Sequence, residues 1–430
     1  MSTAPAGEPA RSPLLARTVP IPDPGDLLDL LPRPDAASTV SWVRRGDGLV
    51  GWGVAARVDT RGETRMADAD TWWRTTAAAM VVRDEVRLPG TGPVAFGSFS
   101  FSRDSAAGGT LVVPQVVVGR RDGRSWRTVV GPAGLGPTPT LAQSRGDVAA
   151  VTAPGDVEFS DGALTSAQWQ RAVAEVIGTI RTGAVEKVVM ARDVVAHTAR
   201  DVDVRHLLRN LAAEYPTCWT FAVDALVGAT PELLVRRDPG LVACRVLAGT
   251  SQRPGDDAAD LRHAAELARS SKDLGEHELA VESVAEALAP YCSSFNVPES
   301  PFVLHLPNVM HLASDVTGVV DRSSPDAPSS LALAAALHPT AAVGGTPTAA
   351  AVEVLAAAER MDRARYAAPV GWMGADGDGE WGIALRSGEV TGPRTVRLFA
   401  GCGIVAASDP AAEARESEAK LRPMRSALTS

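Results

Sequence analysis

The chain has 430 residues, of which 45% are hydrophobic and 22% are charged. This composition supports a large buried core and argues against a disordered protein. The 42 basic and 51 acidic residues give a net charge of −9, which argues against nucleic acid or an anionic membrane as the main partner. A small anionic substrate is still compatible with this charge, because a local pocket can oppose the global sign.

The cysteines and histidines lack the spacing of metal or redox motifs. Cys218, Cys244, Cys292 and Cys402 form no CxxC pair, so we expect inert, reduced thiols. The seven histidines never occur as HExxH, which gives a zinc hydrolase little support. The sequence shows no apolar targeting segment at its start and no uncharged run long enough to span a bilayer, so we expect a cytoplasmic protein.

The first part of the chain reads as a flexible start followed by strands. Residues 1–38 are rich in proline and are expected to form a flexible N-terminal segment. Residues 39–150 contain short β-like runs separated by Gly, Asp and Pro, which is typical of antiparallel strands joined by turns. We therefore expect a β-rich N-terminal lobe there, followed by a catalytic region over 151–430 that forms one compact domain with it.

The second part mixes helical and strand patterns. Residues 165–181 have helical spacing behind a Thr or Ser cap, residues 187–198 are strand-like, and residues 257–289 predict one long helix or two joined ones. Residues 407–428 predict a closing helix in which Asp409 is the N-cap and a proline follows at the first position. No regular βαβ alternation or glycine fingerprint is present, so a dinucleotide-binding fold is not expected.

The closing helix carries a group of charged residues on one face. Glu413 and Glu416 are three positions apart, and Lys420 lies one turn further on. A solvated face with one Glu–Lys pair would explain this pattern. That ordinary explanation is favoured by the pattern alone, and the functional alternative is two carboxylates that offer oxygen ligands to Mg²⁺.

A second acidic cluster lies in the predicted helix over 257–289. It contains Asp273, Glu276, Glu278 and Glu282. A charged outer face is the ordinary explanation, and the pattern does not say which carboxylate points inward.

Other polar residues stand out against apolar surroundings. Lys187 begins an apolar run; it is either solvated at a strand end or, if desolvated, a candidate general base. Glu232 is either an edge carboxylate in solvent or a protonated acid in an apolar site. Arg386 interrupts an apolar strand and needs a partner such as a substrate carboxylate. Gly401 and Gly403 permit close backbone approach to a ligand, although a turn or bulge would also explain them.

Several strings resemble, in order, those of the chorismate-binding enzyme family, which includes isochorismate, salicylate, anthranilate and aminodeoxychorismate synthases. They are KVVMAR (187–192), GATPELLV (228–235), LAGTSQRPG (247–255), SKDLGEHE (271–278), VMHLASDVTG (309–318), LHPTAAVGGTP (337–347), RYAAPVGW (365–372), IALRSG (383–388) and FAGCGIVAASDPAAEARESEAKL (399–421). The first 150 residues resemble the family only in being β-rich. The resemblance implies an α+β fold like that of anthranilate synthase component I, with large, mostly antiparallel sheets packed as a sandwich, helices outside, and an active site in a cleft.

The resemblance also implies a role for individual residues. Metal ligands for Mg²⁺ are implied at Glu276, Glu413 and Glu416. A general base is implied at Lys187 and a general acid at Glu232. Substrate-binding positions are implied at Thr250, His311, Ala342, Tyr366, Arg386, Gly401, Gly403 and Lys420, with Tyr366 and Arg386 holding the enolpyruvyl carboxylate of chorismate.

Two positions distinguish activities within the family. Family members that use ammonia typically carry glutamine where this chain has Lys187, whereas a lysine suits deprotonation of water. Members that go on to eliminate pyruvate usually show Phe-Pro and a threonine where this chain has His338-Pro339 and Ala342. We therefore expect an isomerase that converts chorismate to isochorismate by water attack at C2 and loss of the C4 hydroxyl.

Two alternatives are kept. One is a salicylate synthase, which would also eliminate pyruvate, and the other is a catalytically silent chorismate-binding subunit. The family suggests a monomer without an amidotransferase partner, and a product used for menaquinone or siderophore biosynthesis.

Overall fold

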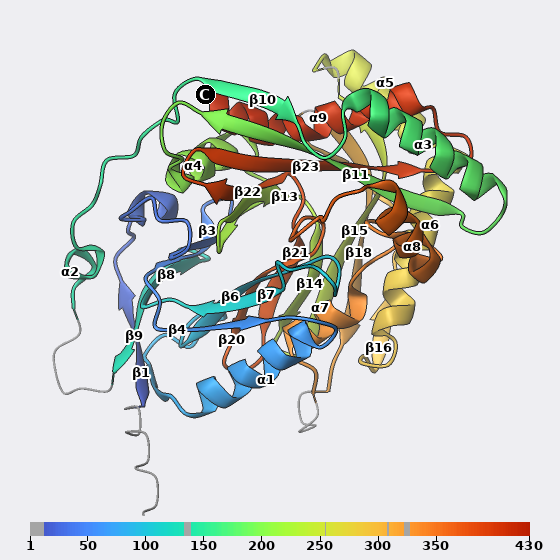
Figure 1. The fold of residues 1–430 in the computed structure, drawn as a ribbon. Coiled ribbons are helices and arrows are strands. Elements are labelled where there is room, and N and C mark those ends of the chain that lie inside the picture. The colour runs from blue at the N-terminus through green and yellow to red at the C-terminus, as the bar shows by residue number, and fades with distance from the viewer. Residues whose placement is uncertain (1–12, 133–138, 254, 308, 322–326) are drawn as a thin grey trace, which may run out of the picture.

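The structure is a computed structural model that describes residues 13–132, 139–253, 255–307, 309–321 and 327–430. Two large β-sheets pack together, and most helices lie on their outer sides (Figure 1). The expected α+β sandwich of mostly antiparallel sheets is confirmed.

The first sheet has 13 strands and combines strands from distant parts of the chain. In sheet order they are β10 (Val157–Asp161), β11 (Lys187–Thr198), β23 (Thr395–Ile404), β22 (Ser387–Gly392), β13 (Leu226–Thr230), β12 (Trp219–Val223), β2 (Thr39–Arg44), β3 (Asp47–Trp52), β8 (Val116–Arg121), β9 (Arg124–Pro132), β1 (Leu14–Ile21) and β5 (Val81–Asp84), with β19 (Gly345–Thr346) paired to β11. The pairing of β1 with β5 is parallel and the other pairings of this sheet are antiparallel.

The second sheet has 10 strands. In sheet order they are β16 (Ser294–Asn296), β18 (Val309–Val319), β15 (Leu241–Gln252), β14 (Leu233–Asp238), β21 (Gly379–Ile383), β20 (Pro369–Gly374), β6 (Val94–Phe99), β7 (Gly109–Val113) and β4 (Ala56–Thr60), with β17 (Phe302–His305) paired to β18. Because β2 pairs with β12 and β6 with β20, the N-terminal strands continue both sheets of the catalytic region.

The helices cover the sheets from outside. They are the 3-10 helix η1 (Leu27–Leu30) and the α-helices α1 (Arg65–Ala78), α2 (Leu141–Arg145), α3 (Ser166–Arg181), α4 (Val204–Glu214), α5 (Asp257–Leu267), α6 (Ser271–Leu288), α7 (Ser330–Leu337), α8 (Thr348–Ala358) and α9 (Pro410–Thr429). Helices α3, α4 and α9 pack on the first sheet, and α1, α6 and α7 pack on the second. No helix in the described part of the chain is long and apolar enough to cross a membrane.

Large aromatic side chains fill the space between the sheets. Trp42, Trp126 and Phe221 from the first sheet pack in one buried cluster with Phe96 and Trp372 from the second. Each is at most 6% exposed, so this cluster excludes water and fixes the two sheets against each other.

Local signals explain where the predicted helices begin. The side chain of Thr165 accepts a hydrogen bond from the backbone of Gln168, whose side chain bonds back to Thr165, so α3 starts with a capping box. The side chain of Asp409 accepts a hydrogen bond from Ala412 at the start of α9. The predicted helical stretch at 257–289 is two joined helices, α5 and α6.

The structure corrects the expected flexible segment over residues 1–38. Within it, β1 pairs along its whole length with β9, and Thr18 Oγ1 lies 2.8 Å from Thr128 Oγ1 across this pair. Proline content was a poor guide here, because an alternating stretch with buried small side chains forms a regular ladder. Residues 1–12 lie outside the described residues, and the boundaries at 38 and 150 stay predictions.

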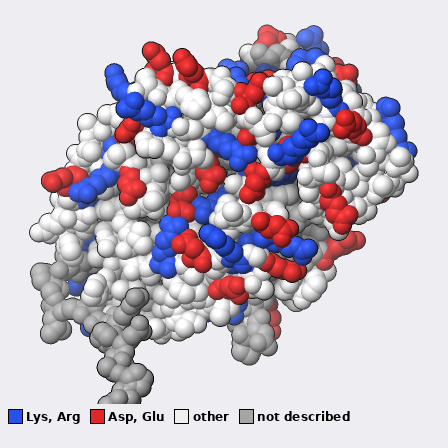
Figure 2. Space-filling model, viewed as in Figure 1, with Lys and Arg blue, Asp and Glu red and all other residues white. Residues whose placement is uncertain are grey.

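Charged side chains on the visible face are mixed in sign. Figure 2 shows Lys and Arg interspersed with Asp and Glu over that face. On the face seen there, the charges form no single-sign stripe of the kind that tracks a nucleic-acid backbone.

Candidate active site

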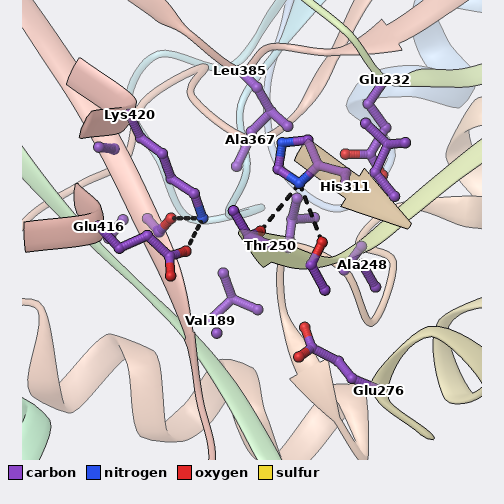
Figure 3. A pocket seen from close by; sticks show the side chains of 18 of the residues that line it. Val189, Glu232, Ala248, Thr250, Glu276, His311, Ala367, Leu385, Glu416 and Lys420 are labelled. Carbon is purple, nitrogen blue, oxygen red and sulfur yellow. Dashed lines mark hydrogen bonds and ion pairs between the residues drawn. The ribbon is translucent and has the colours of Figure 1, made fainter. Parts of the chain in front are cut away.

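The predicted site residues come together in one cavity between the two sheets. It is lined by Lys187, Glu232, Thr250, Glu276, His311, Ala342, Tyr366, Arg386, Gly401, Gly403, Glu413, Glu416 and Lys420, which are all the residues predicted for the site. Figure 3 shows Glu416 and Lys420 approaching this space from one helix, and Glu232 and Glu276 approaching it from other parts of the chain.

One wall is the antiparallel pair β11 and β23. Lys187, Val189 and Ala191 all line the cavity, because alternate residues of a strand point to the same side. Gly403 is opposite Val189 and Gly401 is opposite Ala191 in the ladder.

The two glycines of β23 keep this wall open. A Cβ atom at Gly403 would lie 3.1 Å from Lys187 Cε and 3.3 Å from Glu276 Oε1. A Cβ atom at Gly401 would lie 3.2 Å from Tyr366 Oη. Neither glycine has a positive φ, so the backbone conformation does not require glycine there. The missing side chains instead leave free space in the cavity.

Lys187 is buried at the first position of β11. Its side chain is 6% exposed, and its Nζ donates a hydrogen bond of 2.7 Å to Glu276 Oε1. Burial favours the neutral form of Glu276, but the adjacent Lys187 ammonium outweighs it and lowers the pKa of that carboxyl. The alternative of a solvated lysine at a strand end is therefore wrong.

Glu232 is enclosed between β13 and β14. It is 4% exposed, and burial raises its pKa to about 8, although a backbone hydrogen bond at Leu247 and the charge of Lys187 act in the opposite direction. The carboxyl group is thus mostly protonated near neutral pH. The alternative of an edge carboxylate in solvent is wrong.

Helix α9 presents its carboxylates to the cavity. Lys420 Nζ lies 2.6 Å from Glu416 Oε1 and donates a 3.0 Å hydrogen bond to the carbonyl of Gly401. Glu413 is only 8% exposed, and its pKa is raised by burial and by the negative charge of Glu416. The alternative that these residues form a solvated helix face is therefore wrong.

These carboxylates fit a hard divalent cation. Ligand atoms of Cys402, Glu413 and Glu416 lie within 4.8 Å of one another. Burial raises the pKa of the Cys402 thiol well above its usual value, so the sulfur stays protonated and is a poor ligand for Mg²⁺. The buried Glu413 and the half-buried Glu416 repel each other and are a donor set that a cation would stabilise, and Glu276 faces the same cavity from α6.

Arg386 lies between β21 and β22, so the expectation that it interrupts a strand is wrong. Its φ of 49° places it in the left-handed region, which is unusual for a residue with a side chain. Among the described residues, its side chain makes one hydrogen bond, a long one of 3.4 Å to His311 Nε2. Most of its N–H donors are therefore free to bind an anion in the cavity.

His311 and Tyr366 are neutral neighbours of Arg386. Burial and the charge of Arg386 lower the pKa of His311 well below its usual value, and its Nδ1 lies 3.1 Å from Thr250 Oγ1. Burial raises the pKa of Tyr366, whose ring stacks on Phe399 with centroids 5.2 Å apart. The cavity therefore offers Arg386 and Lys420 as cations beside two neutral hydrogen-bonding side chains.

The acidic cluster on α6 is divided between cavity and solvent. Asp273 and Glu276 line the cavity, whereas Glu278 and Glu282 are exposed. The helix phase could have indicated this division, because only one face of α6 packs on β15 and β18. Further lining residues that were not predicted are Val189, Ala191, Leu247, Lys272, Arg363, Leu385 and Phe399.

Comparison with known proteins identifies the family to which the chain belongs. The model of the family described as chorismate binding enzyme matches residues 10–429. The isochorismate synthase DhbC of Bacillus subtilis (strain 168) is 39% identical over 271 residues, 60% of this chain and 67% of that protein. The isochorismate synthase MenF of the same strain is 32% identical over 382 residues, 84% of this chain and 80% of that protein.

A solved structure agrees at the level of the fold. The menaquinone-specific isochorismate synthase MenF of Escherichia coli matches with a TM-score of 0.80 at 24% identity, over 99% of this chain and 97% of that one. The match of the family model over almost the whole length shows that the chain belongs to the chorismate-binding enzyme family.

Proposed function

We propose that this chain is an isochorismate synthase, which converts chorismate to isochorismate by adding water at C2 and releasing the C4 hydroxyl. The observation that supports this proposal most strongly is that Lys187 and Glu232 line the same cavity. Lys187 supplies a buried amine, and the carboxyl of Glu232 has a pKa that is raised to about 8. The relatives named isochorismate synthase at 32% and 39% identity support the same activity.

The two residues divide the proton transfers. Lys187 acts in its neutral amine form: its Nζ accepts a proton from the attacking water, while the protonated Glu232 donates one to the departing hydroxyl, which leaves as water. A neutral carboxyl suits the second step, because a general acid works best with a pKa near the working pH.

We also propose that Glu276, Glu413 and Glu416 hold Mg²⁺. When bound, the ion would orient the ring carboxylate of chorismate and neutralise its charge. Lys420 would lie beside the same carboxylate, and Gly401 and Gly403 would leave it room.

A second set of residues would hold the enolpyruvyl end of chorismate. Arg386 has free donors for its carboxylate, and Tyr366 adds a phenol O–H. His311 and Thr250 would support Arg386 in that place.

Ala342 favours a reaction that stops at isochorismate. It places a methyl group at the cavity where pyruvate-eliminating relatives usually have a threonine hydroxyl. A cytoplasmic location, a monomeric state, the absence of an amidotransferase partner and the use of the product for menaquinone or a siderophore stay predictions.

The test is an incubation of the protein with chorismate, with and without Mg²⁺, and chromatography of the products. Isochorismate that requires Mg²⁺ and appears without pyruvate is expected. Salicylate with an equal amount of pyruvate would make the chain a salicylate synthase. Binding of chorismate without any product would make it a silent binding subunit.

A further inference from the structure

The strand that carries Lys187 has an open edge beside the cavity. On one side β11 pairs with β23 from Val188 to His197. On the other side β19 pairs with Lys187 and Val188, and β10 pairs only from Val194 onward. Among the described residues, no strand pairs with that edge between these two contacts.

A buried ion pair fills part of this gap. Glu359 follows α8, its Oε1 accepts a hydrogen bond of 2.6 Å from Ala191 N, and it forms an ion pair with Arg363. Arg363 Nη2 donates to the carbonyl of Val189 at 2.5 Å. Both partners are 4% exposed, so these bonds replace a strand ladder in a region that water does not reach.

Another donor of Arg363 reaches a second wall of the cavity. Its Nη1 donates to the carbonyl of Val343, next to Ala342, at 3.0 Å, while its Nε donates to Glu359 Oε2 at 2.8 Å. Its guanidinium lies over the ring of Phe101, 4.3 Å from the centroid, so the segment between β6 and β7 supports it. Arg363 lines the cavity, but four of its five N–H donors are already used, unlike those of Arg386.

We infer that Glu359 and Arg363 are positioning residues that hold Lys187 and the loop of Ala342 in fixed relation on either side of the substrate. The inference rests on the proposed function. The pair joins the backbone two and four residues after Lys187 to the backbone one residue after Ala342, so loosening it displaces both walls. A displacement of about 1 Å at a reacting group can cost on the order of 100-fold in rate.

The kinetic test compares Arg363→Met and Glu359→Gln with a matched control. Arg205 is also buried, pairs with Asp203 on neighbouring positions, and donates to the carbonyls of Pro32, Ala149 and Ala150, but does not line the cavity. The two variants at the pair are expected to lower kcat by about 10- to 100-fold with a smaller change in KM. Arg205→Met is expected to lower Tm with kcat unchanged. A folded Arg363→Met protein with the kcat of the wild type would overturn the inference, as would an equal loss of kcat in Arg205→Met.

Hydrogen exchange of the unaltered protein gives a test that needs neither variants nor turnover. The Ala191 amide, which bonds to Glu359, is expected to exchange as slowly as amides in the ladder between β11 and β23. Exchange at the rate of an exposed loop would show that the pair does not close the edge. A wild-type protein that makes no isochorismate would instead refute the proposed function while leaving this exchange result readable.

Discussion

Two buried carboxyl groups of the cavity, Glu232 and Glu413, have raised pKa values for different reasons. For Glu232 the cause is burial, and the nearby charges of Lys187, Arg386 and Lys420 all act to lower the value. For Glu413 burial is joined by the negative charge of Glu416. Glu232 therefore retains a proton despite its cationic neighbours, whereas Glu413 is also repelled by a second carboxylate on the same helix. The same direction of pKa shift thus fits the proposed proton donor at Glu232 and the proposed Mg²⁺ ligand at Glu413.

The largest expected effect is at Glu232. Replacing it by glutamine keeps the size but removes the transferable proton, so we expect kcat to fall by about 10²- to 10⁴-fold. Steady-state kinetics on chorismate would measure this, with circular dichroism to confirm folding. Glu389→Gln is the control, because burial also raises the pKa of Glu389 but that residue lies outside the cavity. A Glu232→Gln protein with near-normal turnover would show that the acid is another group.

The next effect concerns the cation at the α9 carboxylates. We expect Mg²⁺ to raise the Tm of the wild-type protein, because ligand binding to the folded state stabilises it. In Glu413→Gln the affinity for Mg²⁺ should fall by at least about 10-fold, since even the loss of an outer-shell partner can cost that much. Without Mg²⁺ the same variant should be more stable than the wild type, because the repulsion from Glu416 is gone.

Titration calorimetry and thermal unfolding would measure both quantities. Glu282→Gln is a suitable control, because this residue is exposed on α6 and does not line the cavity. Equal Mg²⁺ affinities in the wild type and Glu413→Gln would argue against the proposed ligands.

The proton on Glu232 should also make stability depend on pH. An ordinary glutamate has a pKa of 4.5, whereas the pKa of Glu232 in the folded chain is about 8. Between these two pH values the folded state therefore binds more protons than the unfolded state. The contribution of Glu232 to stability is then full below 4.5 and is lost as pH rises toward 8, at most about 1.4 kcal/mol per pH unit. Denaturant unfolding at several pH values should show this slope in the wild type and a smaller slope in Glu232→Gln. The same dependence of stability on pH in the wild type and in Glu232→Gln would contradict a protonated Glu232.

The smallest effect is expected at Gly403. The Cβ of Gly403→Ala would press on Lys187 Cε, the flexible end of a side chain, so the stability cost should be near the lower end of the range of about 1–3 kcal/mol for overpacking. We still expect a lower kcat, because Lys187 must move. Gly178→Ala is the control, since no atom lies within 4 Å of its added Cβ. Stopped-flow or steady-state assays showing equal kcat in both variants would remove the argument for close packing at Lys187.

Much of the fold near the site could be predicted from local signals. Thr165 and Asp409 marked the starts of α3 and α9, because capping depends on neighbouring residues alone. Helix α1 was missed within the expected β-rich lobe: its apolar positions, including Trp72 and Trp73, do not form a clear single stripe. The sheet order could not be read at all, since β11 pairs with β23, a strand almost half of the chain away in sequence.

The candidate site also could not be assembled from local sequence signals alone. The resemblance named residues that the structure brings into one cavity, although Lys187, Glu232 and Glu413 each had an ordinary surface explanation in the sequence alone. Glu359 and Arg363 were not singled out. Their importance depends on an unpaired strand edge, which becomes visible only when β10, β11 and β19 are placed together.

The most direct measurement of the central claim is the pH dependence of kcat/KM for chorismate, with Mg²⁺ held at saturation. If the protonated Glu232 is the acid, kcat/KM should fall tenfold per pH unit above a pKa of about 8. A kcat/KM that stays constant to well above that value would contradict the assignment of Glu232 as the proton donor.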